Sequence, residues 1–376
     1  MSADGGEDGT GGGAFTPRRA VLAYPGSLDT PTGGYAYARR LLAECRGGAL
    51  RLDPWPLPGG FPFPDAAVLD ETAERLALLP SGWPVVVDGL ALGALPPRVL
   101  AAAPGPLIAL CHHPLGLETG LDPAKAKALI VSERAALDET AAVIATSAAT
   151  AQLLQAHFGV ASERLTVAEP GTEPARPATG SGGPGVKLLA VGSLIPRKGH
   201  DVLLEALSGC TDLDWRLDIA GADDRDPLHA ALLRQRIKAL GLGERVRLLG
   251  ALDTDALERA YAGADLFALA SHYEGYGMVF TEAMARALPV VGCGSEAVIE
   301  ATRGAARLVA PGDTAALRHA LRALIADPAA RTALGRACAK AGAALPRWSD
   351  TAHAVARAIA QAVAPLPSRQ SRAASG

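Results

Sequence analysis

Short, almost continuous apolar runs alternate along the whole sequence with longer alanine-rich segments of helical spacing. Five such runs lie before residue 172 and six after residue 185; AVLAYPG (20–26) and VKLLAVGS (186–193) are examples. Strands that are apolar on both faces are typical of parallel sheets covered by helices on each side. The alternation therefore predicts an α/β protein built from doubly wound, Rossmann-like sheets.

A segment rich in proline, glycine and serine, EPARPATGSGGPG (173–185), separates the two sets of runs. This composition is typical of a linker. We therefore expect an N-terminal domain (18–175), a linker (176–185) and a C-terminal domain (186–348). Ligands of open α/β sheets bind at the carboxyl ends of the strands, so a cleft between the two domains is the expected site.

Charge and cysteine content narrow the functional classes. A net charge of -3 and a pI near 6.3 give no electrostatic reason to expect nucleic acid or an anionic membrane as the main partner. The five cysteines are scattered without CxxC spacing, which suits a reducing cytoplasm. No apolar run reaches the about 18 residues of a membrane span. Peripheral membrane association and the oligomeric state are left open.

The two ends of the sequence have the composition of disordered segments. Residues 1–17 are glycine-rich and acidic and contain no apolar signal core, and residues 366–376 are polar. Between them, residues 349–365 are expected to form a last helix that packs back on the first domain. Ser349 or Asp350 is its expected N-cap residue.

The stretch AVGSLIPRKGHDVLLEAL (190–207) contains a strand, a basic loop and a helix. The strand ends at Gly192 and Ser193, and the loop carries Arg197 and Lys198. Exposed backbone N–H groups and two cations at such a junction suit a diphosphate. Taken alone, the segment is equally compatible with a solvated loop that carries two surface charges.

Two glutamates, Glu274 and Glu282, flank a glycine-containing turn in SHYEGYGMVFTEAMA (271–285). Gly275 and Gly277 permit a close backbone approach, and the following helix offers free N–H groups. Glutamates placed there can accept hydrogen bonds from sugar or ribose hydroxyls. The alternative is that Glu282 only stabilises a helix N-terminus.

Together, the two motifs resemble the signature of the retaining glycosyltransferases of family 4, which have the GT-B fold. Glu274 and Glu282 match E-x7-E, and GSLIPRKG (192–199) matches the preceding G-x-x-x-x-[RK]-K-G loop. The resemblance implies that Glu282 contacts the nucleotide ribose and Glu274 the donor sugar. It implies that Arg197 and Lys198 bind the donor diphosphate.

The resemblance extends to the first domain. Gly33 and Gly34 match a glycine pair that opens a helix towards the donor phosphates. In LCHHPLGLETG (110–120), a histidine is expected near the donor sugar and the reacting oxygens. Adjacent residues of an extended chain point in opposite directions, so only one of His112 and His113 is expected to face the cleft, with His113 favoured. The alternative is one packed and one exposed histidine.

The complete donor site implied by the resemblance also includes backbone contacts and a base-binding segment around residues 249–252. Besides the two glutamates and the two cations, it consists of Gly33, Gly34, Gly192, Ser193, Leu252, Gly275, Gly277, Met278 and Val279. The sequence departs from the family at AEPGTEP (168–174) and GCGSEA (292–297), which leaves acceptor and phosphate details open. The segment PRWSDTA (346–352) resembles the family's closing helix.

The resemblance implies a cytoplasmic, retaining hexosyltransferase that uses a nucleotide-diphosphate sugar. A UDP-sugar is favoured as donor. The acceptor, whether a small molecule, a lipid or a glycan, cannot be read from the sequence, and no metal ion or other cofactor is expected. Two alternatives remain: another GT-B enzyme such as a nucleotide-sugar epimerase, and an inactive paralogue that only binds the donor.

Two further motifs raise rival interpretations. VVGCGSEAVIEA (290–301) reads G-x-G-x-x-A after a strand, with Asp313 further on, as in NAD(P)-dependent dehydrogenases. Its helix has room for only about two turns and no further βαβ half follows, which disfavours that activity. Asp224-Arg225-Asp226 is a literal D-x-D triplet, as in metal-dependent transferases; we interpret it as a polar loop.

Overall fold

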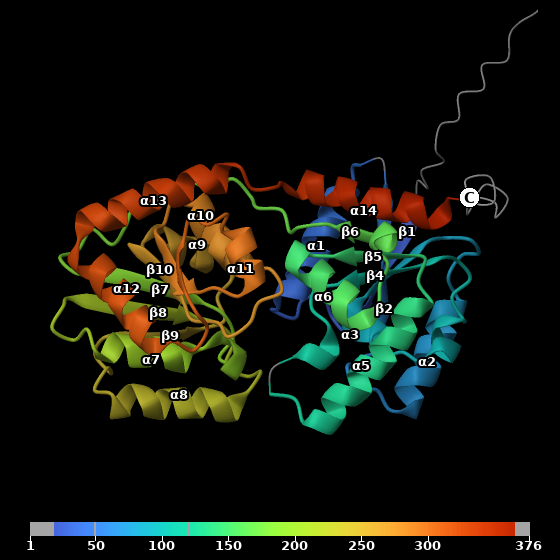
Figure 1. The fold of residues 1–376 in the computed structure, drawn as a ribbon, viewed down its shortest axis with the longest axis horizontal. Helices are drawn as coiled ribbons and strands as arrows, with labels where there is room; N and C mark the ends of the chain where they lie inside the picture. Colours follow the sequence, from blue (N-terminus) through green and yellow to red (C-terminus); the bar gives the residue numbers. More distant parts are fainter. Residues whose placement is uncertain (1–18, 49, 119, 365–376) are drawn as a thin grey trace, which may run out of the picture.

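The computed structural model describes residues 19–48, 50–118 and 120–364 (Figure 1). They form two six-stranded sheets in the orders β2-β1-β3-β4-β5-β6 and β12-β11-β10-β7-β8-β9, and all strand pairs are parallel. The predicted α/β fold with two doubly wound sheets is confirmed. The predicted disordered ends, 1–17 and 366–376, lie outside the described residues.

The N-terminal domain contains the first sheet. Its strands are β1 (Arg19–Pro25), β2 (Arg51–Leu57), β3 (Val85–Asp88), β4 (Leu107–Cys111), β5 (Ala142–Ala145) and β6 (Leu165–Val167). Its helices and 3-10 turns are α1 (Gly33–Cys45), α2 (Ala66–Ala77), α3 (Gly89–Leu92), α4 (Pro97–Leu100), η1 (Leu115–Leu117), α5 (Pro123–Asp138), α6 (Ala148–Phe158) and η2 (Ser162–Arg164).

The C-terminal domain contains the second sheet. Its strands are β7 (Val186–Val191), β8 (Trp215–Ala220), β9 (Val246–Gly250), β10 (Leu266–Leu269), β11 (Val290–Cys293) and β12 (Arg307–Val309). Its helical elements are η3 (Pro196–Lys198), α7 (His200–Ser208), α8 (Pro227–Ala239), α9 (Thr254–Ala262), α10 (Met278–Ala285), α11 (Glu296–Ala301), α12 (Thr314–Ala326) and α13 (Pro328–Ala343). The last helix is α14 (Trp348–Val363).

Strand β2 was not among the predicted runs. Its sequence, RLDPWPL, contains Pro54 and Pro56, which lack the N–H that a strand between two neighbours must donate on both sides. In the structure β2 is an edge strand that pairs only with β1. An edge strand tolerates proline because one row of its N–H groups has no partner strand.

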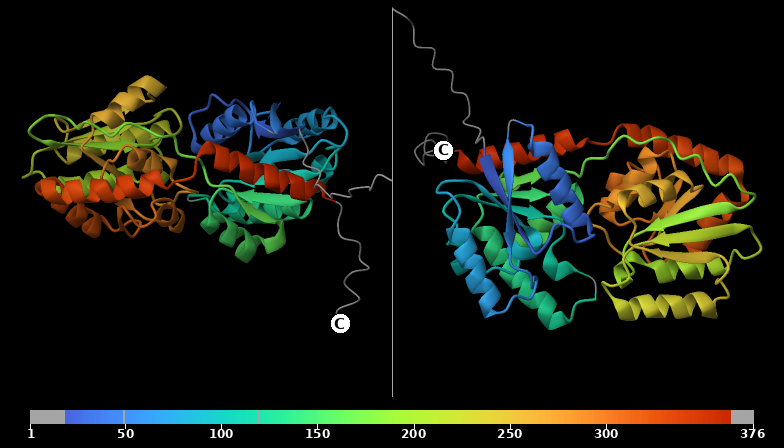
Figure 2. Two further views of the ribbon diagram at one scale, coloured as in Figure 1. Left: turned by 90° about the horizontal axis from the view of Figure 1, so that it is seen from above. Right: turned by 180° about the vertical axis from the view of Figure 1, so that it is seen from behind.

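Helix α14 belongs to the core of the N-terminal domain although it follows the whole C-terminal domain in sequence (Figure 2). Trp348, Val355 and Ile359 are buried against Tyr37 and Leu41 of α1. Burial of an aliphatic side chain of this size contributes about 1.5–3 kcal/mol. The helix begins one residue before the predicted N-cap residues.

The N-cap residue of α14 is Arg347 rather than Ser349 or Asp350. Both predicted residues lie inside the first turn, and the carboxylate of Asp350 accepts a hydrogen bond from the Arg347 backbone N–H at 2.8 Å. The helix therefore begins with a capping box, in which the acidic residue acts from the N3 position.

The two connections between the domains lie against each other. Thr172, on the way out of the N-terminal domain, donates its N–H to the Pro346 carbonyl oxygen at 2.8 Å. Its own carbonyl accepts from the Arg347 guanidinium at 3.0 Å. Gly171 packs so closely on the returning chain that a Cβ built there would lie 2.2 Å from the Trp348 nitrogen. The two crossings therefore form one paired junction.

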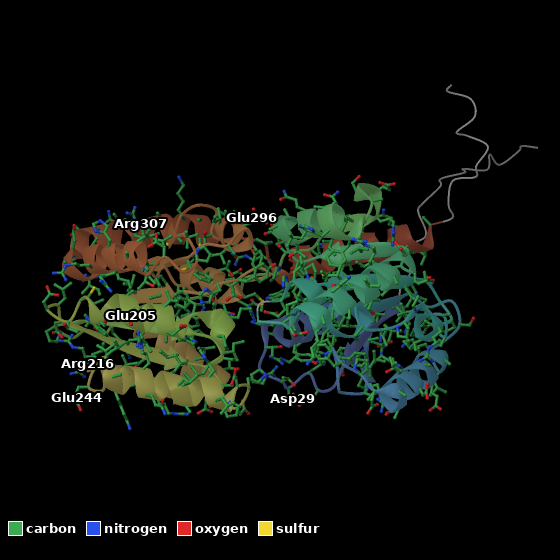
Figure 3. All side chains as sticks on the ribbon, turned by 60° about the horizontal axis from the view of Figure 1, so that its bottom comes forward. Asp29, Glu205, Arg216, Glu244, Glu296 and Arg307 are labelled. Atoms are coloured by element: carbon green, nitrogen blue, oxygen red, sulfur yellow. The ribbon has the colours of Figure 1, made fainter. Side chains whose placement is uncertain are left out.

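Charged side chains of both signs are spread over the exterior, among them Glu205, Arg216, Glu244, Glu296 and Arg307 of the C-terminal domain (Figure 3). This distribution agrees with the small net charge of the sequence. Within the described ranges, no helix has the length and apolar character to cross a membrane.

Candidate active site

A cavity of about 750 Å³ lies between the two domains, at the carboxyl ends of both sheets. Asp88 and His112 line it from the ends of β3 and β4, and Gly192 and Gly221 line it from the ends of β7 and β8. Parallel strands direct all of their carboxyl ends to one edge, so residues far apart in sequence meet there. Every individually named residue of the predicted donor site lines this cavity; of the base-binding segment, residues 251 and 252 line it and residues 249 and 250 do not.

The basic loop is held by glycines at the strand ends. Gly199 has φ +60°, and a Cβ there would lie 2.0 Å from the Ala270 carbonyl oxygen. A Cβ at Gly221 would lie 1.9 Å from the Gly192 carbonyl oxygen, so β7 and β8 approach each other directly below the loop. The ring of His200, at the start of α7, lies 3.1 Å from the same Gly192 oxygen. These contacts fix where Arg197 and Lys198 emerge.

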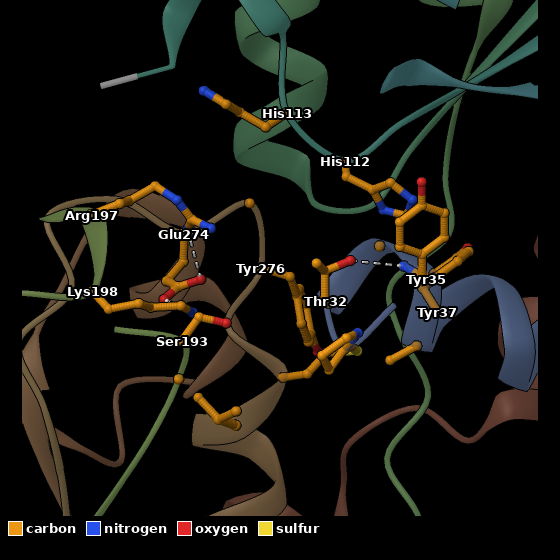
Figure 4. A pocket seen from close by; sticks show the side chains of 18 of the residues that line it. Thr32, Tyr35, Tyr37, His112, His113, Ser193, Arg197, Lys198, Glu274 and Tyr276 are labelled. Atoms are coloured by element: carbon orange, nitrogen blue, oxygen red, sulfur yellow. Dashed lines mark hydrogen bonds and ion pairs between the residues drawn. The ribbon is translucent and has the colours of Figure 1, made fainter. Parts of the chain in front are cut away.

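Glu274 joins the two motifs that the sequence indicated (Figure 4). Its Oε1 accepts from Lys198 Nζ at 2.7 Å and from Ser271 Oγ at 2.6 Å, and its Oε2 lies 3.3 Å from Arg197 Nη1. Burial disfavours the charged carboxylate, but Lys198 and Arg197 outweigh it and lower the pKa of Glu274. A buried, ionised carboxylate thus lies between two cations.

Glu282 lies on α10, one side of the same cavity. Its Oε2 accepts a hydrogen bond from the Tyr261 hydroxyl at 2.9 Å. Burial raises the pKa of Glu282, although the Tyr261 hydrogen bond and the charge of Arg286 act in the opposite direction. The Tyr261 hydroxyl therefore holds one oxygen of the carboxylate in place.

The turn between the glutamates opens α10. Gly277, with φ +98°, is the N-cap residue, a conformation that L side chains adopt at an energetic cost. The first N–H groups of a helix have no partner within it, and here they include those of Met278 and Val279. Both residues line the cavity. The helix N-terminus therefore presents donors and a positive dipole end to the cleft.

On the opposite side, α1 begins at Gly33 with Thr32 as its N-cap residue. The Thr32 side chain accepts from the Tyr35 N–H at 3.4 Å. A Cβ at Gly34 would lie 3.3 Å from Cδ2 of His112, so the glycine leaves room for that ring. A Cβ at Gly33 would lie 3.6 Å from Cε of Met278 of the other domain. Gly33 thus faces the start of α10, whereas Gly34 faces His112.

Both histidines line the cavity, so the prediction that only one of them faces the cleft was wrong. Strand β4 ends at Cys111, and the chain bends at His112 and His113. The alternation of an extended chain therefore does not apply to this pair. His112 stands edge-on to Tyr37, with ring centroids 5.1 Å apart. The His113 ring lies 4.0 Å from that of Tyr273, centroid to centroid.

The electrostatic surroundings keep His113 neutral. Burial lowers its pKa, and Arg197 acts in the same direction, whereas Glu118 opposes both. A hydrogen bond between the ring and the Leu117 backbone also opposes the effect of burial on this pKa. Glu118 itself lies 3.4 Å from the Arg197 guanidinium, Oε1 to Nε. An imidazole whose pKa is lowered therefore borders the cavity beside the cations.

Asp88 is a candidate site residue that the sequence analysis missed. It is 4% exposed and ends β3, and its Oδ1 accepts from the Leu90 N–H at 2.9 Å. Its Oδ2 lies 3.5 Å from Nε2 of His112. The signal was an acid directly after the apolar run WPVVV, a position that reaches the carboxyl edge of the sheet.

Side chains of each domain also bond to the other. Glu300 of α11 accepts from the backbone N–H groups of Ala148 and Ala149, at 2.8 and 3.1 Å, and so covers the N-terminus of α6. Glu169 contacts Tyr276 and Arg303. Glu300 was not predicted, because its partners are backbone groups about 150 residues away.

The rival motifs have structural roles. Residues 290–301 form β11 and α11, but α11 has only six residues and β12 after it is the edge of the sheet. The D-x-D triplet lies in a loop, as predicted, and Asp226 caps α8 by accepting from the His229 N–H. The part of the chain that the structure describes holds no group of three His, Cys, Asp or Glu suited to a metal ion.

Comparison with known proteins agrees with this geometry. The profile of the family described as Glycosyl transferases group 1 matches residues 172–341, and that of Glycosyltransferase Family 4 matches residues 35–176. D-inositol 3-phosphate glycosyltransferase 1 from Catenulispora acidiphila is 31% identical over 310 residues, which cover 75% of this chain and 73% of that protein. The chain belongs to glycosyltransferase family 4.

Other matches are shorter or more distant. Mannosylfructose-phosphate synthase from Agrobacterium fabrum is 32% identical over 166 residues, 40% of this chain and 37% of that protein. The structure of sucrose-phosphate synthase from Thermosynechococcus elongatus has a TM-score of 0.76 at 19% identity. The match covers 90% of this chain and 98% of that protein. The structure of HepE from Anabaena, in complex with UDP and glucose, has a TM-score of 0.67 at 17% identity. The match covers 89% of this chain and 98% of that protein. The shared fold is GT-B.

Proposed function

We propose that this family 4 protein transfers a hexose from a UDP-sugar to an acceptor hydroxyl, with retention at the anomeric carbon and without a metal ion. The observation that carries the proposal is the cluster of Glu274, Lys198 and Arg197 at the base of the cleft that Glu282 also lines. A buried carboxylate between two fixed cations suits a sugar hydroxyl on one side and a diphosphate on the other.

Glu282 is the proposed ribose ligand. Tyr261 holds one of its oxygens, so the other can accept from the ribose diol without a change in the side chain's orientation. Leu252, after β9, lies on the same wall and is the proposed neighbour of the base. The structure of HepE in complex with UDP and glucose, a protein of the same fold, supports UDP as the nucleotide.

The cations and the α10 N-terminus stabilise the leaving group. When the bond between the anomeric carbon and the phosphate oxygen breaks, negative charge develops on the UDP diphosphate. Arg197, Lys198 and the N–H groups of Gly277, Met278 and Val279 are already oriented towards that charge, which is the largest catalytic contribution expected. The acceptor oxygen bonds to the anomeric carbon on the same face, and its proton passes to the departing phosphate oxygen.

The two histidines border the sugar-binding region from the N-terminal domain. His113 remains neutral because burial lowers its pKa, so it can accept or donate one hydrogen bond to the donor sugar. His112, placed by Asp88, lies nearer to α1 and the acceptor side. Both are proposed to contact substrates.

Thermal shift with a panel of nucleotide sugars, with and without EDTA, tests donor and metal dependence. We expect a UDP-sugar to stabilise the protein equally in both conditions. Stabilisation by NAD(P) alone would instead support the dehydrogenase reading. Loss of UDP-sugar stabilisation in EDTA would contradict metal independence. NMR of the products separates transfer from epimerisation of the donor, and an inactive paralogue would give binding without product.

Site variants test the catalytic assignment. In a UDP-release assay, the double variant R197A/K198A should lose at least about 100-fold in kcat. Glu282→Ala should mainly raise the donor KM. Arg216→Ala, an exposed cation of the same domain, is the matched control and should behave as wild type. Wild-type turnover in the double variant would exclude the proposed site.

A further inference from the structure

The segment AEPGTEP (168–174), where the sequence departs from the family pattern, follows β6 and reaches the cleft, where Pro170 lines the cavity. The main chain of Glu169 belongs to the N-terminal domain, because its carbonyl oxygen accepts from the Thr351 hydroxyl of α14 at 2.7 Å. Its side chain instead bonds to residues of the C-terminal domain. Glu169 therefore connects the scaffold of one domain to side chains of the other.

One oxygen of the Glu169 carboxylate receives two hydrogen bonds across the domain boundary. Its Oε2 accepts from the Tyr276 hydroxyl at 3.2 Å and from the Arg303 guanidinium. Burial and the negative charge of Glu169 raise the pKa of Tyr276, so the phenol keeps its proton and donates this hydrogen bond. The contact between Glu169 and Tyr276 is thus a hydrogen bond to a charged acceptor, which is one of the stronger classes.

Tyr276 provides the one side chain between the two glycines of the turn that opens α10. It is 4% exposed, and it lines the cavity. Gly275 is already fixed by its close approach to the His112 carbonyl oxygen. Gly277, with φ +98°, has the broad conformational freedom of glycine and no side chain of its own to pack. The Tyr276 hydrogen bond therefore limits the conformation of the turn on the side that leads into the helix.

The residues directly after Tyr276 carry the N–H groups that the proposed function assigns to the leaving group. The Gly277 N–H belongs to the same planar peptide unit as the Tyr276 carbonyl, so a rotation of that unit turns the donor directly. Donors of this kind stabilise developing charge only when they are oriented before the charge appears. A change in the position of Tyr276 therefore alters the donors at the start of α10.

We infer that Glu169 is a positioning residue of the donor site, a role that rests on the proposed function. Glu169 itself does not line the cavity, so it acts through another residue. It holds the Tyr276 hydroxyl, and this contact keeps the N–H groups at the start of α10 directed at the terminal phosphate of the donor. Because Glu169 is part of the N-terminal domain, the alignment requires both domains.

Calorimetry on the full-length protein tests this inference with UDP and UMP, which differ only by the terminal phosphate. The measured quantity is the ratio of the two dissociation constants. Tyr276→Phe and Glu169→Ala each remove the hydrogen bond, so each should reduce the preference for UDP about fivefold and leave UMP binding within about twofold of wild type. The double variant should reduce the preference no further, because both changes remove the same bond. An unchanged preference in Tyr276→Phe would overturn the inference.

Two further variants separate positioning from a purely structural role. Glu169→Gln retains an oxygen for the Tyr276 hydroxyl but loses the charge opposite Arg303, so it should keep the preference for UDP. If it behaved like Glu169→Ala, the ion pair with Arg303 would be the role of Glu169, and the inference would be wrong. Glu173→Ala, at a half-exposed position of the same segment that pairs with Arg40, is the matched control and should bind both nucleotides as wild type does.

The same titrations distinguish this inference from the proposed function. Thermal unfolding verifies that each variant is folded. A wild-type protein that binds neither UDP nor UMP would reject the proposed function together with the role of Glu169. Normal UDP binding, with one preference shared by wild type and all variants, would reject only the role of Glu169.

Discussion

Gly275 meets His112 backbone to backbone across the cleft: a Cβ built at position 275 would lie 2.2 Å from the His112 carbonyl oxygen. The Thr150 hydroxyl reaches the carbonyl oxygens of both residues, at 3.5 Å for His112 and 3.4 Å for Gly275. The turn that follows Glu274 can therefore pack against the segment that carries the histidines only when position 275 has no side chain.

Gly275→Ala should separate the two halves of the site. The added methyl group cannot be accommodated by a flexible side chain, because the group it meets is a main-chain carbonyl. We expect kcat to fall at least about tenfold, because a misplacement of about 1 Å can lower the rate by 100-fold. Gly243→Ala is the control, since a Cβ there meets nothing within 4 Å. Steady-state UDP release measures kcat. Equal kcat for both variants would refute the role of the contact.

Asp88→Asn tests whether Asp88 positions His112. Asparagine retains the oxygen that caps α3 through the Leu90 N–H, so the melting temperature should change little. The charge that faces the imidazole is lost, and kcat should fall on the order of tenfold at unchanged donor KM. Asp70→Asn, an exposed position of the same domain, is the matched change. A raised donor KM with normal kcat would assign Asp88 to donor binding instead.

Glu300→Ala should uncover an anion site and weaken the contact between the domains. Loss of a carboxylate cap of this type destabilises by about 1 kcal/mol. The freed N–H groups of Ala148 and Ala149 should then bind inorganic phosphate, which should raise the melting temperature of the variant but not that of wild type. Glu296→Ala, on the exposed face of the same helix, is the control. The same phosphate-dependent shift in melting temperature in wild type and both variants would contradict the role of Glu300 at the N-terminus of α6.

Glu133 makes stability depend on pH. It is 2% exposed under the histidine loop, where it accepts from the Leu115 N–H, and burial raises its pKa to about 8. An acid whose pKa is raised on folding holds its proton longer in the folded state. The contribution of Glu133 to the free energy of unfolding is therefore largest below about pH 4.5, and it is lost as the pH rises to about 8.

Glu133→Gln isolates this effect, since the amide retains a hydrogen-bond acceptor and cannot ionise. Urea unfolding at pH 5.5 and 7.5 should show wild type losing about 2 kcal/mol relative to the variant across that interval. His200, whose pKa burial lowers to about 4, acts in the opposite direction below pH 6.5. It is common to both proteins and cancels in the difference. Parallel pH profiles would show that Glu133 is ionised in the folded state.

Sequence patterns predicted most of the fold because buried parallel strands have a local apolar signal. Eleven of the twelve strands produced it, and β2 did not because Pro54 and Pro56 mask an edge strand. The start of α7 was also predictable, because Gly199 ends the basic loop and is the N-cap residue of the helix.

The site was predictable where residues lie in one motif, and less so where it depends on distant partners. The pairing of Lys198 with Glu274 joins residues 76 positions apart, and its geometry follows from the order of β7 and β10 in the sheet. Asp88 and Glu300 act through groups of other elements. An acid directly after an apolar run marks Asp88, whereas no local pattern marks Glu300. The two histidines depart from strand alternation because β4 ends just before them.

The paired junction at Thr172 and Pro346 has a consequence for folding order. Topologically, the C-terminal domain is an insertion between β6 and α14, and its two ends are neighbours. Its core needs nothing from α14, whereas the N-terminal core lacks Trp348, Val355 and Ile359 until the insertion has been synthesised. On the ribosome, the domain that is translated first is therefore completed last.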